Sequence, residues 1–216
     1  MASVTTRLSI AVATAIVLWF LMFSPWTAHF FNFWWAMTAS AVILTSIAFI
    51  FGGNPLQVGS YVQKPNVRTI ASELSLGVVV AVVLWGIFWT GDKLSQALFD
   101  FARPQVDLIY TMKDGESACL IATLLLCIIG PAEELFWRGY IQRTLAIRHS
   151  PLYAFILTTL IYTIVHLPSG NFMLIMAAMT CGFLWGGLYY LMPRHLPAIV
   201  ISHALWDAAA FVWFPF

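Results

Sequence analysis

Long apolar stretches separated by short polar links constrain this chain more than any other feature of its sequence. Residues 31–51 and 172–191 contain no charged side chain, and about 20 such residues suffice for a helix to cross the hydrocarbon core of a bilayer. Only 9% of the 216 residues are charged and 61% are hydrophobic, whereas about 25% are charged in a typical soluble domain. The sequence therefore predicts an integral membrane protein.

The apolar stretches predict an all-α polytopic transmembrane bundle of about seven spans. We expect the spans near residues 8–23, 31–51, 70–90, 117–147, 152–167, 172–191 and 197–213. Segment 91–116 interleaves charged and apolar side chains, which favours an amphipathic segment on the membrane surface. Pro131 is expected to bend the fourth span, because proline removes one backbone hydrogen bond.

The chain has no room for a separate soluble domain, so we expect one integrated membrane domain. Residues 1–116 would form the N-terminal transmembrane helices and the surface segment, and residues 117–216 a helical core that carries the chemistry. Ala178, Gly182 and Gly186 form a small-residue stripe on the sixth span, which predicts close packing against another helix. Seven tryptophans are expected as membrane-interface anchors or lipid-facing surface: Trp19, Trp26, Trp34, Trp35, Trp85, Trp89 and Trp213.

The distribution of basic residues predicts how the chain is oriented. With the N-terminus inside, the inner side would hold Arg7, Lys64, Arg68, Arg143, Arg148 and Arg194. The outer side would hold Lys93, Arg103 and Lys113, which are interspersed with acids. The positive-inside rule then predicts a multi-pass protein of the inner or plasma membrane with a cytoplasmic N-terminus. The bilayer is an expected partner, and nucleic acid is not, because the basic residues form no patch.

Three charged residues lie inside the apolar fourth span: Glu133, Glu134 and Arg138. A charge at the middle of a bilayer costs roughly 3 kcal/mol or more, so such residues are usually functional or paired. Glu134 and Arg138 are four residues apart on one helix face and can pair directly. Glu133 is rotated by about 100° from Glu134 and need not share that partner. We therefore expect Glu133 to be the carboxylate that remains able to take a proton.

Ionisable side chains recur in two later spans, at His166 and at His203 with Asp207. Counting about 1.5 Å per residue from the inner-side arginines, these groups and the glutamates can share one layer of the bilayer. The sequence thus predicts an intramembrane polar cavity. The spacing of His203 and Asp207 fits either an aspartate that orients an imidazole or two metal ligands on one helix face. A desolvated carboxylate beside a neutral histidine suits water activation, so peptide hydrolysis fits this set of residues.

The motifs Glu133-Glu134-xxx-Arg138, Tyr162-xxx-His166 and His203-xxx-Asp207 resemble those of the CPBP intramembrane endopeptidases. This family, CAAX protease and bacteriocin-processing or Abi, includes the type II CAAX prenyl proteases, and the resemblance covers about residues 121–210. It implies that Glu133 activates water, that Glu134 and Arg138 support it, and that His166 is a second catalytic group. It further implies that His203 and Asp207 position the oxyanion or the water.

Two positions depart from the common family pattern. Tyr162 stands where phenylalanine is common and adds a hydroxyl that can form a hydrogen bond in the cavity. Asp207 stands where asparagine is common, which changes the charge balance of the site. The implied substrate is a membrane-anchored or lipidated peptide or protein.

The residues leave metal dependence open, as family members are described both as metalloproteases and as glutamate-dependent hydrolases. Zinc could take Glu133, His166 and His203 as ligands and keep a position for water. Against zinc, the chain has no His-Glu-xx-His helix, and the two histidines lie on separate spans. We favour water activation without a cofactor and keep zinc as the alternative.

Two other functions use the same residues differently. A proton-coupled transporter could use the acids as a relay, although no inverted repeat relates the two halves of the chain. A non-catalytic membrane scaffold of the same fold would need none of the motif residues.

Overall fold

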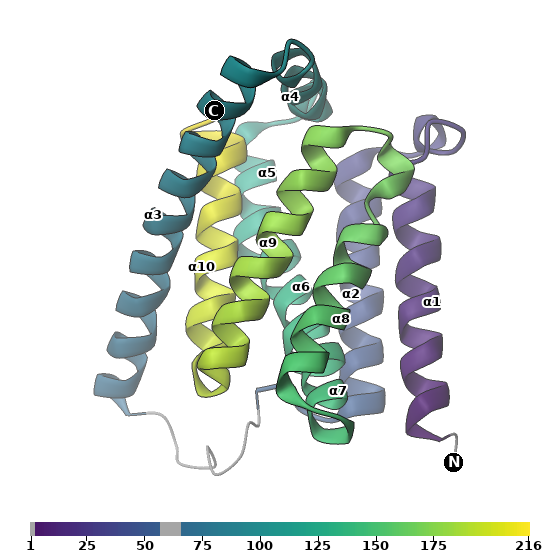
Figure 1. Ribbon diagram of the computed structural model, residues 1–216, viewed down its shortest axis with the longest axis vertical. Coiled ribbons are helices and arrows are strands. Elements are labelled where there is room, and N and C mark those ends of the chain that lie inside the picture. Colours follow the sequence, from purple (N-terminus) through teal and green to yellow (C-terminus); the bar gives the residue numbers. More distant parts are fainter. Residues whose placement is uncertain (1–2, 57–65) are drawn as a thin grey trace.

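The computed structural model describes residues 3–56 and 66–216, which form a bundle of helices (Figure 1). Within these described residues, seven helical segments are long and apolar enough to cross a membrane. Their bounds are Val4–Phe23, Phe33–Gly52, Val67–Leu98, Ala118–Arg148, Pro151–Ser169, Phe172–Leu191 and Pro193–Trp213. The described residues contain no strand. The predicted all-α bundle of about seven spans is confirmed.

The first spans are α1 (Val4–Phe23), α2 (Phe33–Gly52) and α3 (Val67–Leu98), and the short helix α4 (Ala102–Tyr110) follows them. The fourth span combines α5 (Ala118–Leu124), α6 (Gly130–Phe136) and α7 (Arg143–Arg148), and the last three are built on α8 (Pro151–Ile164), α9 (Phe172–Leu191) and α10 (Leu196–Ala208). Several helices begin where the sequence provides a capping side chain. The caps that accept a backbone N–H are Ser3, Asn32, Asn66, Ser117, Ser150 and Asn171.

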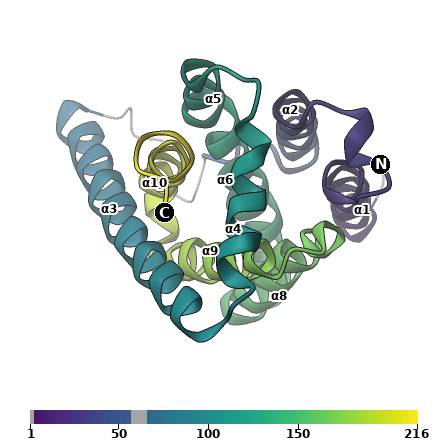
Figure 2. The same ribbon diagram turned by 90° about the horizontal axis from the view of Figure 1, so that it is seen from above.

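The surface segment is shorter than expected. Residues 91–98 continue α3, and only α4 lies across the end of the bundle (Figure 2). Polar residues of this extension contact one another: Asp92 Oδ2 accepts from Gln96 Nε2 at 2.6 Å and from Lys93 Nζ at 3.1 Å. The amphipathic prediction holds for α4, whose Ala102 and Val106 are buried.

The fourth span runs on through Pro131 as one stretch of helical turns with two wider π turns, Leu125–Ile129 and Trp137–Gln142. Pro131 lies in the first turn of α6, directly after the first π turn, where a missing N–H is tolerated. The two π turns flank α6, the turn that carries Glu133 and Glu134. Such bulges occur frequently at functional sites in helices.

Glycines bring α10 close to both of its neighbours. A Cβ on Gly130 of α6 would lie 2.7 Å from the Cα of Ala204, and one on Gly77 of α3 would lie 2.7 Å from Cγ2 of Ile201. Glu73, one turn before Gly77, caps α10 by accepting from the backbone N–H of Ala198 at 3.1 Å. Helix α10 is therefore held between α3 and α6.

The predicted small-residue stripe on α9 packs against α8. A Cβ on Gly182 would lie 3.3 Å from Cγ2 of Thr159, and one on Gly186 would lie 3.2 Å from Cδ2 of Phe155. The prediction of close helix packing is confirmed.

The contact of Gly77 with α10 gives a test with a matched control on the same helix. We expect Gly77→Ala to destabilise the protein by about 1–3 kcal/mol, because the new methyl group overlaps Ile201 and the carbonyl oxygen of Ala198. Gly86→Ala should leave stability within about 0.5 kcal/mol, because a Cβ there meets no atom within 4 Å. Thermal unfolding of the purified protein in detergent measures both changes. Equal melting temperatures for the two variants would contradict this packing.

Candidate active site

A cavity of about 570 Å³ lies within the bundle, lined by residues of α1, α2, α3, α4, α8, α9 and α10 and of the fourth span. Most lining side chains are aromatic or aliphatic. Glu133, Tyr162, His166, His203 and Asp207 contribute polar groups to the wall, and Asp92 and Ser95 of α3 also line the cavity. Four of the six candidate residues therefore line one cavity, as the sequence predicted, while Glu134 and Arg138 lie behind its wall.

Glu134 is the centre of a buried network that joins three helices. Arg138 Nη1 donates to Glu134 Oε1 at 2.9 Å, and His203 Nδ1 lies 2.7 Å from the same oxygen. Arg138 Nη2 also donates to the carbonyl oxygen of Cys181 on α9 at 3.2 Å. Glu134 has no exposed surface, and Arg138 is 1% exposed. The predicted Glu134–Arg138 pair is confirmed, and it also ties α6 to α9 and α10.

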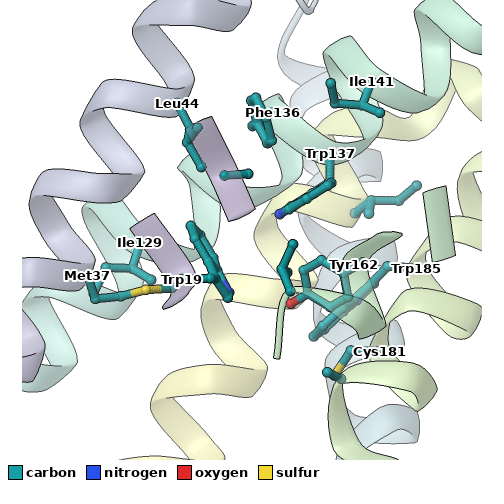
Figure 3. Packing of buried hydrophobic residues seen from close by; sticks show 14 of the residues in the cluster. Trp19, Met37, Leu44, Ile129, Phe136, Trp137, Ile141, Tyr162, Cys181 and Trp185 are labelled. Carbon is teal, nitrogen blue, oxygen red and sulfur yellow. The ribbon is translucent and has the colours of Figure 1, made fainter. Parts of the chain in front are cut away.

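Glu133 occupies a different environment although it is the neighbouring residue. Its Oε2 accepts a hydrogen bond of 2.8 Å from the Tyr162 hydroxyl, and its side chain lines the cavity. Tyr162 packs edge-on against Trp137, with ring centroids 5.3 Å apart (Figure 3). The hydroxyl that distinguishes this chain from the common family pattern therefore bonds to the carboxylate that faces the cavity.

The spacing of His203 and Asp207 fitted either an aspartate that orients the imidazole or two metal ligands. In the structure, Asp207 Oδ2 lies 3.5 Å from Nε2 of His203, and Glu134, which the sequence did not indicate, contacts Nδ1 at 2.7 Å. The Trp185 ring stacks on the imidazole at a centroid distance of 3.8 Å. The contact with Glu134 depends on helix packing: Gly130 lets α6 approach α10 closely enough for its glutamate to reach the ring. His203 and Asp207 still form a polar pair on the cavity wall.

His166 lies just beyond the end of α8 and is 6% exposed. Its Nδ1 lies 2.7 Å from the carbonyl oxygen of Tyr162, and its Nε2 accepts a hydrogen bond of 3.2 Å from Trp19 Nε1. Among the described residues, no hydrogen bond joins it to Glu133 or His203. It lines the same cavity but stands apart from the glutamate network.

Whether Glu133, His166 and His203 could bind zinc depends on which of their donor atoms are free. Both ring nitrogens of His166 are engaged, by Tyr162 and Trp19, and Nδ1 of His203 is engaged by Glu134. Within residues 3–56 and 66–216, no three histidine, cysteine, aspartate or glutamate side chains converge as a metal site would require. The arrangement of Glu133, His166 and His203 therefore does not fit a three-ligand zinc site.

The sequence did not predict that Trp19 contacts His166. We expected it at the membrane interface or facing lipid, but it and Trp34 are buried, with 0% and 2% exposure. Helix α1 carries no motif and no charged residue near Trp19, so its sequence holds no signal for a contact with His166. Trp26 and Trp35 are exposed, as expected.

Comparison with known proteins supports the resemblance. Residues 115–209 match the family model described as type II CAAX prenyl endopeptidase Rce1-like. This segment contains all six candidate residues, and it is similar to a family of membrane endopeptidases. The match supports the resemblance of this segment to a CAAX-protease-like family of the CPBP type. No curated protein and no solved structure matches the chain.

The two glutamates should differ in their effect on stability. We expect Glu134→Gln to destabilise the protein by about 3 kcal/mol, because it leaves the buried Arg138 without its counter-charge. Glu133→Gln should cost about 1 kcal/mol or less, because glutamine retains an oxygen that accepts from Tyr162. Thermal or denaturant unfolding of the two purified variants decides the order. A larger loss in Glu133→Gln would contradict the assignment of Glu134 as the structural partner.

Proposed function

We propose that this protein is an intramembrane endopeptidase that hydrolyses a peptide bond of a membrane-anchored or lipidated protein, using water activated by Glu133. The observation that carries the proposal is the separation of two adjacent carboxylates. Glu134 is buried between Arg138 and His203, while Glu133 lines an otherwise largely apolar cavity. An apolar cavity suits a lipidated or membrane-embedded segment, and the family match supports substrates of this class.

In the proposed mechanism, Glu133 removes a proton from a water molecule as the water oxygen attacks the carbonyl carbon of the peptide bond. Glu133 then passes that proton to the leaving amine as the C–N bond breaks. The Tyr162 hydroxyl holds one oxygen of Glu133, so the carboxylate keeps a defined orientation. We assign His203 and Asp207, the other polar pair on the cavity, to positioning the water and the substrate carbonyl oxygen.

The arrangement favours this reaction over the two alternatives. A transporter relay needs a chain of connected acids that continues across the membrane. The acids that line the cavity are Asp92 on α3, Glu133 on α6 and Asp207 on α10, and among the described residues no hydrogen bond joins one of them to another. A scaffold function does not explain why Glu133 lines a cavity while Glu134 pairs with Arg138 and His203.

Cleavage by three forms of the protein tests the mechanism. With the protein reconstituted in liposomes and a panel of lipidated and membrane-anchored peptides, we expect Glu133→Gln to lower kcat by at least about a thousandfold, because the base is lost. Tyr162→Phe should lower kcat by about tenfold, because Glu133 loses one hydrogen bond. Cleavage should persist in the presence of a chelator. Undiminished cleavage by Glu133→Gln would refute the mechanism, and loss of wild-type cleavage on chelation would refute metal-free water activation.

We also propose that the N-terminus is cytoplasmic. The termini lie at opposite ends of the bundle (Figure 1), as seven spans require. Arg7, Arg68, Arg143, Arg148 and Arg194 belong to the links and helix ends that the charge distribution assigns to the inner side, and Lys64 lies outside the described residues.

Protease protection tests this orientation. A tag at Met1 in inside-out vesicles should be removed by added protease, while a tag after Phe216 should be protected. The opposite pattern of protection would reverse the proposed orientation.

A further inference from the structure

Helix α1, which lies outside the matched segment 115–209, supplies a hydrogen bond to the site. The indole N–H of Trp19 donates to His166 Nε2 at 3.2 Å, and Trp19 has no exposed surface. The ring packs edge-on against Trp137 with centroids 6.4 Å apart, and both tryptophans are labelled in Figure 3. One turn further along α1, the Phe23 ring lies 5.4 Å from the imidazole of His166. His166 is thus enclosed by α1 as well as by its own segment.

The two partners of His166 determine where its proton lies. The Tyr162 carbonyl oxygen can only accept, so the nitrogen 2.7 Å away, Nδ1, carries the hydrogen. The indole nitrogen of Trp19 can only donate, so Nε2 presents its lone pair. The ring is therefore the neutral Nδ1–H tautomer with both nitrogens occupied.

We propose that Trp19 is a positioning residue of the site: it holds His166 in this tautomer and occupies the nitrogen that a metal ion would need. The held ring in turn fixes the Tyr162 carbonyl near the end of α8. The hydroxyl of the same Tyr162 bonds to Glu133 at 2.8 Å. A continuous series of contacts thus runs from α1 through His166 and Tyr162 to Glu133.

The tautomer can be observed by ¹⁵N NMR, without measuring cleavage. The sample is the intact protein in lipid nanodiscs with ¹⁵N-labelled histidines. The His166 signals are identified by their loss in His166→Gln. We expect one protonated nitrogen, Nδ1, and one accepting nitrogen, Nε2, at neutral pH, and no shift of these signals on adding one equivalent of Zn²⁺. A proton on Nε2, or a Zn²⁺-dependent shift of His166 in the wild type, would overturn the proposal.

Two tryptophan variants separate the hydrogen bond from packing. Trp19→Phe retains an aromatic ring and removes the donor, so the His166 Nε2 signal should move. Trp137→Phe is the matched control, because Trp137 is a neighbouring buried tryptophan whose indole N–H has no partner within the described residues. Because Trp137 packs against Trp19 and Tyr162 without a hydrogen bond to His166, its replacement should move the His166 Nε2 signal less than Trp19→Phe does. An unchanged spectrum in Trp19→Phe, or equal shifts in both variants, would overturn the proposal.

The kinetic consequence rests on the proposed peptidase function. Trp19→Phe should lower kcat by about tenfold, the rate equivalent of one lost hydrogen bond, and leave KM within about twofold, because Trp19 does not line the cavity. A raised KM with unchanged kcat would contradict a positioning role. If the wild type cleaves no membrane-anchored peptide, the proposed function fails, while the spectra still decide the role of Trp19.

Discussion

The structure depends on keeping one guanidinium and one carboxylate together inside a protein that is surrounded by lipid. An unpaired charge at that depth costs several kcal/mol, so Arg138 and Glu134 must remain in contact once the fourth span is inserted. Their remaining hydrogen bonds go to the carbonyl oxygen of Cys181 on α9 and to His203 on α10. The pair therefore determines how the last two spans pack against α6. The contacts that neutralise the buried charge therefore also connect the helices that carry the candidate residues.

The network is possible because the backbone of α10 lies close to the backbones of α6 and α3. Gly130 admits α10 to within van der Waals distance of α6, three residues before Glu133, and Gly77 admits the opposite side of α10 to α3. The π turns on either side of α6 change which side chains face inward within a single span. The glycines and the π turns thus determine where the side chains of α6 and α10 lie relative to one another.

The cavity combines contributions from both halves of the chain. The matched segment 115–209 carries the six candidate residues, while α2, α3 and α4 provide apolar lining and α3 also provides Asp92. Helix α1 adds Trp19 behind His166. Helices outside the matched segment therefore complete the cavity around the candidate residues.

The sequence by itself determined the membrane embedding, the number of spans and the Glu134–Arg138 pair, because span length and four-residue spacing are local properties of a helix. It also named the residues that would share the cavity, since charges in lipid must gather. The tertiary structure alone decided that Glu134, and not Asp207, contacts Nδ1 of His203 and that Trp19 contacts His166. Those contacts join residues 69 and 147 positions apart, and they depend on how closely two helices approach, which no local pattern encodes.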